Sequence, residues 1–284
     1  MLTIFALPKP FQGHIGVIQR NAIRSWTLLR PACEIILIGD EEGTAEVARE
    51  FHVRHVPHIA RNDYGTPLVN DLFDKGERLA SHDTLCYVNS DIILMSDFMR
   101  AARQIVDRKR RFLMVGLRWN VDVTEPWDFT SDWEERLKDY IKKYGEAGDP
   151  SAIDYFLFTR GLWGDIPPFA IGRFKWDNWL LYRARFRGAP LIDAKDVVMA
   201  VHQNHGYSHA LGGAKVITSS PEADRNLELA ESHFSIFSIR DATHRLCSKG
   251  LQIVNLRRRL GTLPTLYRLR CRRRVRQILL EYLT

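Results

Sequence analysis

Long hydrophobic runs are missing from this sequence of 284 residues. The longest runs, such as residues 35–38, have the length of a β-strand and fall far short of the roughly 18 apolar residues that span a bilayer. The first residues also lack the basic region that precedes the apolar part of a secretion signal. We therefore expect a protein without a membrane span and without a leader peptide.

Cysteine is scarce, with four in the whole chain and no Cys-x-x-Cys pair among them. This spacing excludes a disulfide framework and favours free thiols in a reducing compartment, so we expect a cytoplasmic protein. No repeat, low-complexity tract or Gly/Ser linker interrupts the first 250 residues. The sequence thus predicts one domain over residues 1–250 and a tail over residues 251–284.

Acidic residues are absent between Arg257 and Arg276, a segment that contains nine arginines. The rest of the chain holds 32 basic and 34 acidic residues, so the formal charge of +7 belongs to the tail. Apolar residues alternate with these arginines, as in helices that lie in a membrane interface. We expect a basic amphipathic helix that contacts an anionic membrane surface, peripheral to the inner face of the membrane. A helix packed on the domain, with its basic face in solvent, is the other interpretation.

The first half of the chain alternates short β-branched runs with amphipathic stretches. This rhythm predicts an α/β fold, in which a Rossmann-like single domain has a mostly parallel central sheet. Ligands of such sheets bind at the carboxyl ends of the strands. Asp40 and Asp91 both fall at predicted strand ends. The predicted strands cover residues 2–6, 34–38, 53–56 and 85–88, and the predicted helices cover residues 17–29, 44–51 and 67–79.

The segment Asn89-Ser90-Asp91 places two oxygen-bearing side chains directly after a hydrophobic strand. Mg²⁺ and Mn²⁺ bind such oxygens and leave other positions to phosphate and water. An ion held there would neutralise the charge that develops on a diphosphate leaving group. The alternative interpretation is a simple turn after a strand.

Three features together carry a family resemblance: Asp40 after the second strand, the segment from Arg61 to Phe73, and the run from Tyr87 to Ile92. Over roughly residues 1–210 the chain resembles bacterial family-2-like glycosyltransferases of the type A, nucleotide-diphospho-sugar transferase fold. The resemblance implies that Asp40 contacts the nucleotide and that residues 89–91 occupy the position of the DxD metal motif.

The first position of that motif is Asn89 where the family has aspartate. A neutral amide offers an oxygen but no charge, so Asp91 is the principal metal ligand that we expect and Asn89 assists with metal or ribose. Arg61 and Arg173 are assigned to the diphosphate because planar guanidinium groups match phosphate oxygens. Asn70, inside the matched segment, is assigned to donor binding.

The segment Gly172 to Leu180 resembles the region in which inverting members of this fold place a catalytic carboxylate. An acceptor hydroxyl needs a positioned base when it attacks the anomeric carbon, and Asp177 is our candidate. The alternative is a carboxylate that only complements the start of a helix. Asp154 is the second catalytic candidate, as a ligand of acceptor hydroxyls or as the base itself.

Histidines recur at positions 202, 205 and 209. On a helix they would share one face and suggest zinc, but Asn204 and Gly206 favour a loop after a strand. The resemblance implies that a late histidine completes the metal site or touches the diphosphate. We therefore assign His202 and His205 to the metal.

The sequence predicts a glycosyltransferase that uses a nucleotide-diphosphate sugar with Mn²⁺ or Mg²⁺ and a glycan or lipid-linked acceptor, in the synthesis of surface polysaccharide or glycolipid. A sugar nucleotidyltransferase shares the fold, but its glycine-rich basic loop is only partly matched by residues 8–16. A nucleic-acid-binding protein that acts through the arginine-rich tail is a third alternative. No nucleic-acid-binding signature supports it, so we expect no nucleic-acid partner.

Overall fold

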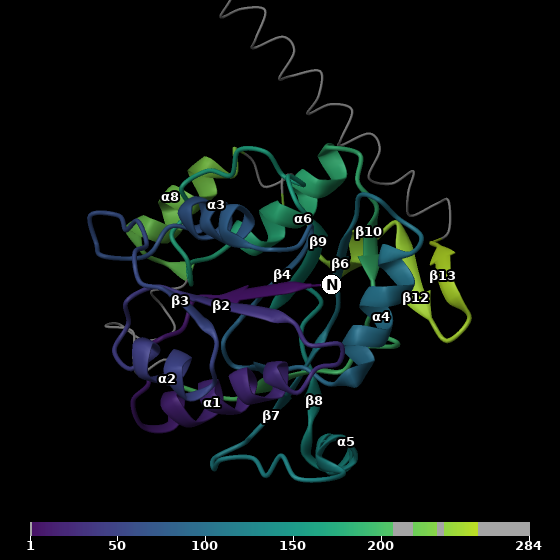
Figure 1. The fold of residues 1–284 in the computed structure, drawn as a ribbon. Coiled ribbons are helices and arrows are strands. Elements are labelled where there is room, and N and C mark those ends of the chain that lie inside the picture. Colours follow the sequence, from purple (N-terminus) through teal and green to yellow (C-terminus); the bar gives the residue numbers. More distant parts are fainter. Residues whose placement is uncertain (1, 207–217, 232–235, 255–284) are drawn as a thin grey trace, which may run out of the picture.

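The computed structural model describes residues 2–206, 218–231 and 236–254. These residues form three layers, in which a large central sheet lies between two sets of helices (Figure 1). The predicted α/β class with a mostly parallel sheet is confirmed. No described helix has the length and apolar character that crossing a membrane requires.

The central sheet has nine strands in the order β13-β12-β10-β6-β9-β4-β1-β2-β3. The apolar residues of β1, β2, β4, β6, β9 and β10 are buried on both faces, as is typical of a sheet covered by helices on each side. Their bounds are Thr3–Ala6 (β1), Glu34–Ile38 (β2), Arg54–Val56 (β3), Thr84–Val88 (β4), Leu113–Val115 (β6), Tyr155–Thr159 (β9), Leu191–Asp193 (β10), His244–Cys247 (β12) and Gly250–Ile253 (β13).

Strand β9 runs antiparallel to both of its neighbours, β4 and β6. Its first residue, Tyr155, pairs with Val88 at the end of β4. The amino end of β9 therefore lies at the same sheet edge as the carboxyl ends of the parallel strands. This reversal brings Asp154 beside Asn89, whose backbone N–H donates to the carbonyl oxygen of Asp154 at 2.9 Å.

Helices α1, α2 and α4 cover one face of the sheet, and α3, α6 and α8 cover the other (Figure 1). Each face has its own apolar core, and the second is rich in aromatic rings that include the buried Trp163 and Trp176. The helices span Gly13–Thr27 (α1), Thr44–Glu50 (α2), Val69–Leu79 (α3), Ser96–Val106 (α4), Trp133–Tyr144 (α5), Trp176–Phe186 (α6) and Pro221–Leu229 (α8), and a short 3-10 helix covers Ile239–Asp241 (η2).

A second sheet has four strands in the order β5-β11-β7-β8. The strands are Ile92–Ile93 (β5), Arg118–Val121 (β7), Glu146–Ala147 (β8) and Ala200–Gln203 (β11). Strand β11 pairs with β5 so that His202 lies opposite Ile92, next to Asp91. Helix α5 packs on this sheet through Leu137 and Ile141.

One expectation from the sequence needs correction. We placed His202 in a loop after a strand, but His202 lies within strand β11 because β5 and β7 pair on its two sides. The central sheet extends to Ile253, where β13 pairs with β12. The rest of the proposed tail, residues 255–284, lies outside the described residues.

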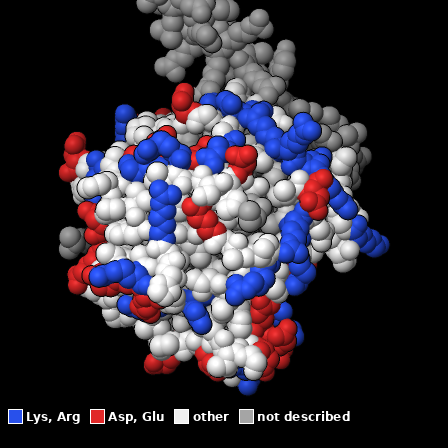
Figure 2. Space-filling view, in the orientation of Figure 1, with Lys and Arg blue, Asp and Glu red and all other residues white. Residues whose placement is uncertain are grey.

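Acidic and basic side chains are interspersed on the face of the molecule in Figure 2, and a band of Lys and Arg runs along its right side. Over much of this face, neighbouring side chains of opposite sign offset each other. This mixture agrees with the nearly balanced charge count outside the arginine-rich segment.

Candidate functional site

Polar residues follow three neighbouring parallel strands at one edge of the central sheet. Lys9 comes after β1, Asp40 after β2 and Asp91 after β4. Parallel pairing of β1 with β2 and with β4 places these three ends side by side. This carboxyl edge is where α/β sheets bind their ligands, as the sequence predicts for this chain.

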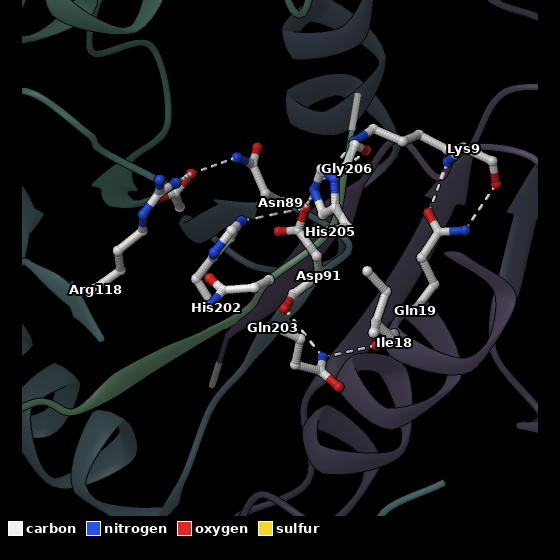
Figure 3. Close-up of polar contacts among 12 residues, drawn as sticks. Lys9, Ile18, Gln19, Asn89, Asp91, Arg118, His202, Gln203, His205 and Gly206 are labelled. Atoms are coloured by element: carbon white, nitrogen blue, oxygen red, sulfur yellow. Dashed lines mark hydrogen bonds and ion pairs between the residues drawn. The ribbon is translucent and has the colours of Figure 1, made fainter. Parts of the chain in front are cut away.

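Asp91, His202 and His205 form a compact group at this edge. One potential ligand atom from each residue lies within 4.8 Å of the others. The Oδ2 atom of Asp91 is 3.1 Å from Nε2 of His205 and 4.0 Å from Nε2 of His202 (Figure 3). The structure thus brings together the aspartate and the two histidines that we assigned to a metal.

The chemistry of this group suits a divalent cation. Oδ1 of Asp91 and Nδ1 of His202 are buried, and neither has a hydrogen-bond partner among the described residues. Buried polar atoms without partners are rare and need an explanation such as an ion. A carboxylate with two imidazoles is a ligand set that Mn²⁺ and related ions accept. The residues therefore fit a bound metal ion.

The electrostatic surroundings keep Asp91 ionised. Burial alone would raise the pKa of its carboxyl group, but the hydrogen bond with His205 and the electrostatic effects of His202 and Lys9 hold that pKa well below its ordinary value. Burial lowers the pKa of His202, although Asp91 acts in the opposite direction. A carboxylate beside a neutral imidazole is the protonation state that metal binding requires.

Lys9 reaches this group from the loop between β1 and α1. Its Nζ atom is 3.4 Å from Nε2 of His205 (Figure 3). Burial lowers the pKa of the Lys9 amine, while Asp91 and Asp154 act to raise it. A cavity of about 480 Å³ opens here, lined by Lys9, Pro10 and residues 12–15 of the loop and helix α1, and by His205 and Gly206.

Asn89 points away from the histidines toward Asp154. Its side-chain amide donates to Oδ1 of Asp154 at 2.7 Å, and its oxygen accepts from the Tyr87 hydroxyl at 2.9 Å. Nη1 of Arg118 lies 3.0 Å and 3.1 Å from the two Asp154 oxygens. Asn89 therefore connects the metal motif to a buried ion pair, and its role as a metal ligand stays a prediction.

Asp177 lies in the first turn of α6, close to the same centre. Burial raises the pKa of its carboxyl group to about 7, and the charge of Asp154 adds to this rise. Asp91, Asp154 and Asp177 all act on the buried Tyr87 hydroxyl, whose pKa is raised first by burial and then by these three charges. Three carboxylates that we selected from separate parts of the sequence thus lie near enough to this hydroxyl to influence it.

The predicted diphosphate partners lie in ion pairs with carboxylates. Arg61 binds Asp40 at 2.6 Å and Glu41 at 2.9 Å. Arg173 binds the buried Glu222 at 2.7 Å. Asp40 remains exposed, as nucleotide binding requires.

Asn70 lies in the first turn of α3. Its side-chain oxygen is buried and has no hydrogen-bond partner in the part of the chain that the structure describes. His209 lies outside the described residues.

Two residues of the site escaped the sequence analysis. Lys9 belongs to the loop that we compared with nucleotidyltransferases, so its position after the first strand was a usable signal. Arg118 reaches Asp154 only because β9 reverses direction and β7 joins a second sheet. Nothing in the sequence around Arg118 marks that contact.

No protein-family model matches this chain, and no curated protein matches it either. Among solved structures, S. aureus TarS is similar with a TM-score of 0.49 and 11% identity, over 71% of this chain and 60% of that one. The complex of TarS with UDP-GlcNAc matches with a TM-score of 0.34 and 12% identity, over 42% of this chain and 35% of that one.

Glucosyl-3-phosphoglycerate synthase from Mycobacterium tuberculosis, in complex with Mn²⁺, UDP and glucosyl-3-phosphoglycerate, has a TM-score of 0.46 and 14% identity over 72% of each chain. The mannosyltransferase PcManGT from Pyrobaculum calidifontis, in complex with GDP-Man and Mn²⁺, has a TM-score of 0.44 and 13% identity. It matches over 71% of this chain and 56% of its own length. The chain spans 35% to 60% of the length of the two TarS structures described above, and similarity at this level transfers no activity to it.

Proposed function

We propose that this protein is a glycosyltransferase that moves a sugar from a nucleotide-diphosphate sugar to an acceptor hydroxyl. One observation carries the proposal: a carboxylate with lowered pKa and two histidines lie at the carboxyl edge of the sheet, and a carboxylate with a pKa of about 7 lies at the same centre. Transfer to a hydroxyl needs both a site for a charged leaving group and a base.

The donor side is built from the ends of β1, β2 and β4. Exposed Asp40 is placed to accept hydrogen bonds from a nucleotide, and Asp91, His202 and His205 are the residues that would hold Mn²⁺ or Mg²⁺. When bound, such an ion neutralises charge on the diphosphate as the bond to the sugar breaks. Lys9 adds a positive charge next to the cavity.

The acceptor side centres on Asp177. A carboxylate with a pKa near 7 is partly ionised at neutral pH and still basic enough to take a proton from an attacking hydroxyl. Arg118 and Asn89 hold Asp154 in place, and its negative charge keeps the pKa of Asp177 high. Asp154 is therefore better suited to tune the base than to be the base.

Ligand protection tests this function directly. Thermal unfolding is measured with a panel of nucleotide-diphosphate sugars, each with Mn²⁺ and with a chelator. A true donor should stabilise the fold by about 3 kcal/mol at a hundredfold excess over its dissociation constant, and chelation should reduce this effect. Lack of protection by every donor, together with no release of nucleoside diphosphate on incubation with acceptors, would refute the proposal.

A sugar nucleotidyltransferase is the second candidate because Lys9, Pro10 and residues 12–15, which line the cavity, belong to the segment that partly matches the glycine-rich basic loop of this class. That reaction releases pyrophosphate from a nucleoside triphosphate and a sugar phosphate. Pyrophosphate release in the presence of these two substrates, without nucleoside diphosphate release from activated sugars, would favour the second candidate.

We also propose that the arginine-rich tail brings the enzyme to an anionic membrane surface, where a lipid-linked acceptor for surface polysaccharide or glycolipid would lie. The nine arginines and interleaved apolar residues between Arg257 and Arg276 support this localisation. The full chain should sediment with anionic vesicles at low salt and dissociate at high salt. Equal sedimentation by a chain that ends at residue 254 would refute this role of the tail.

A further inference from the structure

The loop that carries Lys9 is fixed to helix α1. The Lys9 N–H donates to the side-chain oxygen of Gln19 at 2.7 Å, and the Gln19 amide donates back to the Lys9 carbonyl at 2.8 Å (Figure 3). Gln19 is buried, so no water competes for these two hydrogen bonds. A Cβ atom at Gly16 would come within 2.7 Å of the Phe11 carbonyl oxygen, so the loop packs directly on the helix. The backbone of Lys9 is therefore held, and its side chain is the part that can move.

The amine of Lys9 and a divalent ion would use the same nitrogen. Nζ of Lys9 is 3.4 Å from Nε2 of His205, which is also 3.1 Å from Oδ2 of Asp91. Nδ1 of His205 lies 3.1 Å from the carbonyl oxygen of Gly206. Nε2 of His205 serves one contact at a time: its proton donates to Asp91, or, without that proton, its lone pair accepts from the amine of Lys9 or binds a metal. A bound metal therefore excludes the contact with Lys9.

The cavity beside Lys9 offers its side chain another position. The amino end of the 15-residue helix α1 lines this cavity, with no acidic residue in its first turn and no side-chain cap. The first N–H groups of a helix have no partner within it and attract anions. His14 lines the same cavity and fixes its wall through a contact of 3.0 Å with the Asn204 carbonyl oxygen.

We propose that Lys9 is a built-in competitor of the metal ion, which occupies the cation position beside Asp91 and His205 until a phosphate group in the cavity draws it away. This inference rests on the proposed function, since the phosphate would belong to the donor. Lys9 neutralises Asp91 while the ion is absent. Once its side chain turns to a phosphate, His205 is released for the metal, and metal and donor favour each other's binding.

The substitution Lys9→Met tests both parts of the inference, because competition with the metal predicts tighter Mn²⁺ binding and contact with a phosphate predicts weaker phosphate binding. Mn²⁺ binding in the absence of nucleotide is measured from the electron paramagnetic resonance signal of free Mn²⁺. Removal of the competing charge should tighten Mn²⁺ binding by about tenfold or more, because a unit charge a few ångströms from a divalent ion is strongly repelled. Binding of inorganic pyrophosphate, measured by calorimetry with a chelator present, should weaken by a similar factor.

Three further variants serve as controls. Lys195→Met removes a lysine that pairs with Asp193, away from Asp91 and His205, and should change neither affinity. Lys9→Arg keeps the charge and should bind both ligands much as the natural chain does. Lys9→Gln, of similar length to methionine and polar, repeats the test if Lys9→Met fails to fold.

The outcomes separate the inference from the proposed function. Weaker Mn²⁺ binding by Lys9→Met would show that the amine supports the ion and would overturn the inference. Unchanged pyrophosphate binding would overturn the part that concerns phosphate. If the natural chain binds neither Mn²⁺ nor pyrophosphate, the proposed function itself fails at this site.

Discussion

Asp91 and Asp177 act on the same tyrosine hydroxyl, yet their surroundings move their pKa values in opposite directions. Both side chains lose contact with water, which by itself favours the neutral acid. Asp91 has two histidines and Lys9 around it, and these lower its pKa. Asp177 has the negative Asp154 nearby, which adds to the effect of burial. Burial therefore dominates at Asp177, whereas the positive neighbours of Asp91 outweigh burial there.

This difference assigns a separate task to each side of the site. A carboxylate that stays ionised at every ordinary pH is suited to hold a cation and unsuited to exchange protons. A carboxylate that titrates near neutral pH is suited to proton transfer. Pairs of acids with divergent pKa values are a recurring arrangement at catalytic centres.

Removal of the Asp91 charge should have the largest effect. Asp91→Asn leaves two histidines without their carboxylate and should lower turnover by roughly three orders of magnitude, because metal stabilisation of a leaving group contributes several kcal/mol. Turnover and Mn²⁺ affinity are measured together, with Asp196→Asn as a control whose carboxylate pairs with Arg245 instead. Full activity of Asp91→Asn, or undiminished activity in excess chelator, would remove the metal from the reaction.

Asp177→Asn should affect turnover but not donor binding. Loss of a general base lowers kcat by about a hundredfold to ten-thousandfold, whereas the residues proposed to bind the donor are untouched. In the natural enzyme kcat should also rise as the pH passes through about 7, where Asp177 loses its proton, and this limb should vanish in the variant. A loss confined to donor affinity would contradict the assignment.

The same substitution should stabilise the fold in alkaline solution. Because the pKa of Asp177 is raised from 3.8 to about 7, the folded chain binds more protons than the unfolded chain between these values, and stability falls as the pH rises through them. Relative to the natural chain, Asp177→Asn should be more stable at about pH 8 than near pH 4 by roughly 4 kcal/mol, since each pKa unit corresponds to about 1.4 kcal/mol. Urea unfolding at the two pH values measures the gain, and equal differences at both would exclude Asp177 as the titrating group.

Asp154→Asn should give the smallest change. The substitution removes a negative charge that raises the pKa of Asp177, so the acid limb of the kcat profile should move down by about one pH unit. Asp149→Asn, which removes an exposed carboxylate bonded to Ser151 in the same loop, should leave the limb in place. If the acid limb does not move in Asp154→Asn, the charge of Asp154 does not raise the pKa of Asp177.

The parallel part of the fold was predictable because its signals are local. Hydrophobic runs of strand length alternate with amphipathic stretches over the first 90 residues, and the observed β2, α2 and β4 lie within one residue of their predicted bounds. Asp40 and Asp91 could be found because a polar residue after a buried strand has a defined place in such a sheet.

The rest depended on pairings that no local pattern encodes. The aromatic run that forms β9 gives no sign that it reverses direction, so the contacts of Asp154 with Asn89 and Arg118 could not be foreseen. The resemblance selected His202 and His205, but only the pairing of β11 with β5 shows how they meet Asp91. The position of Lys9 after the first strand could be read from the sequence, but the hydrogen bond from its backbone to the buried side chain of Gln19 could not.

The position of β11 between β5 and β7 also has a consequence for the order of folding. Asp91 and His205 are 114 residues apart in the chain, and the two sides of the metal group meet only when β11 has docked. Contacts of such long range form slowly, because loop closure precedes the gain from pairing. The affinity for Mn²⁺ should therefore develop late during refolding, after the secondary structure. A stopped-flow measurement of metal binding would report when β11 pairs with β5 and β7.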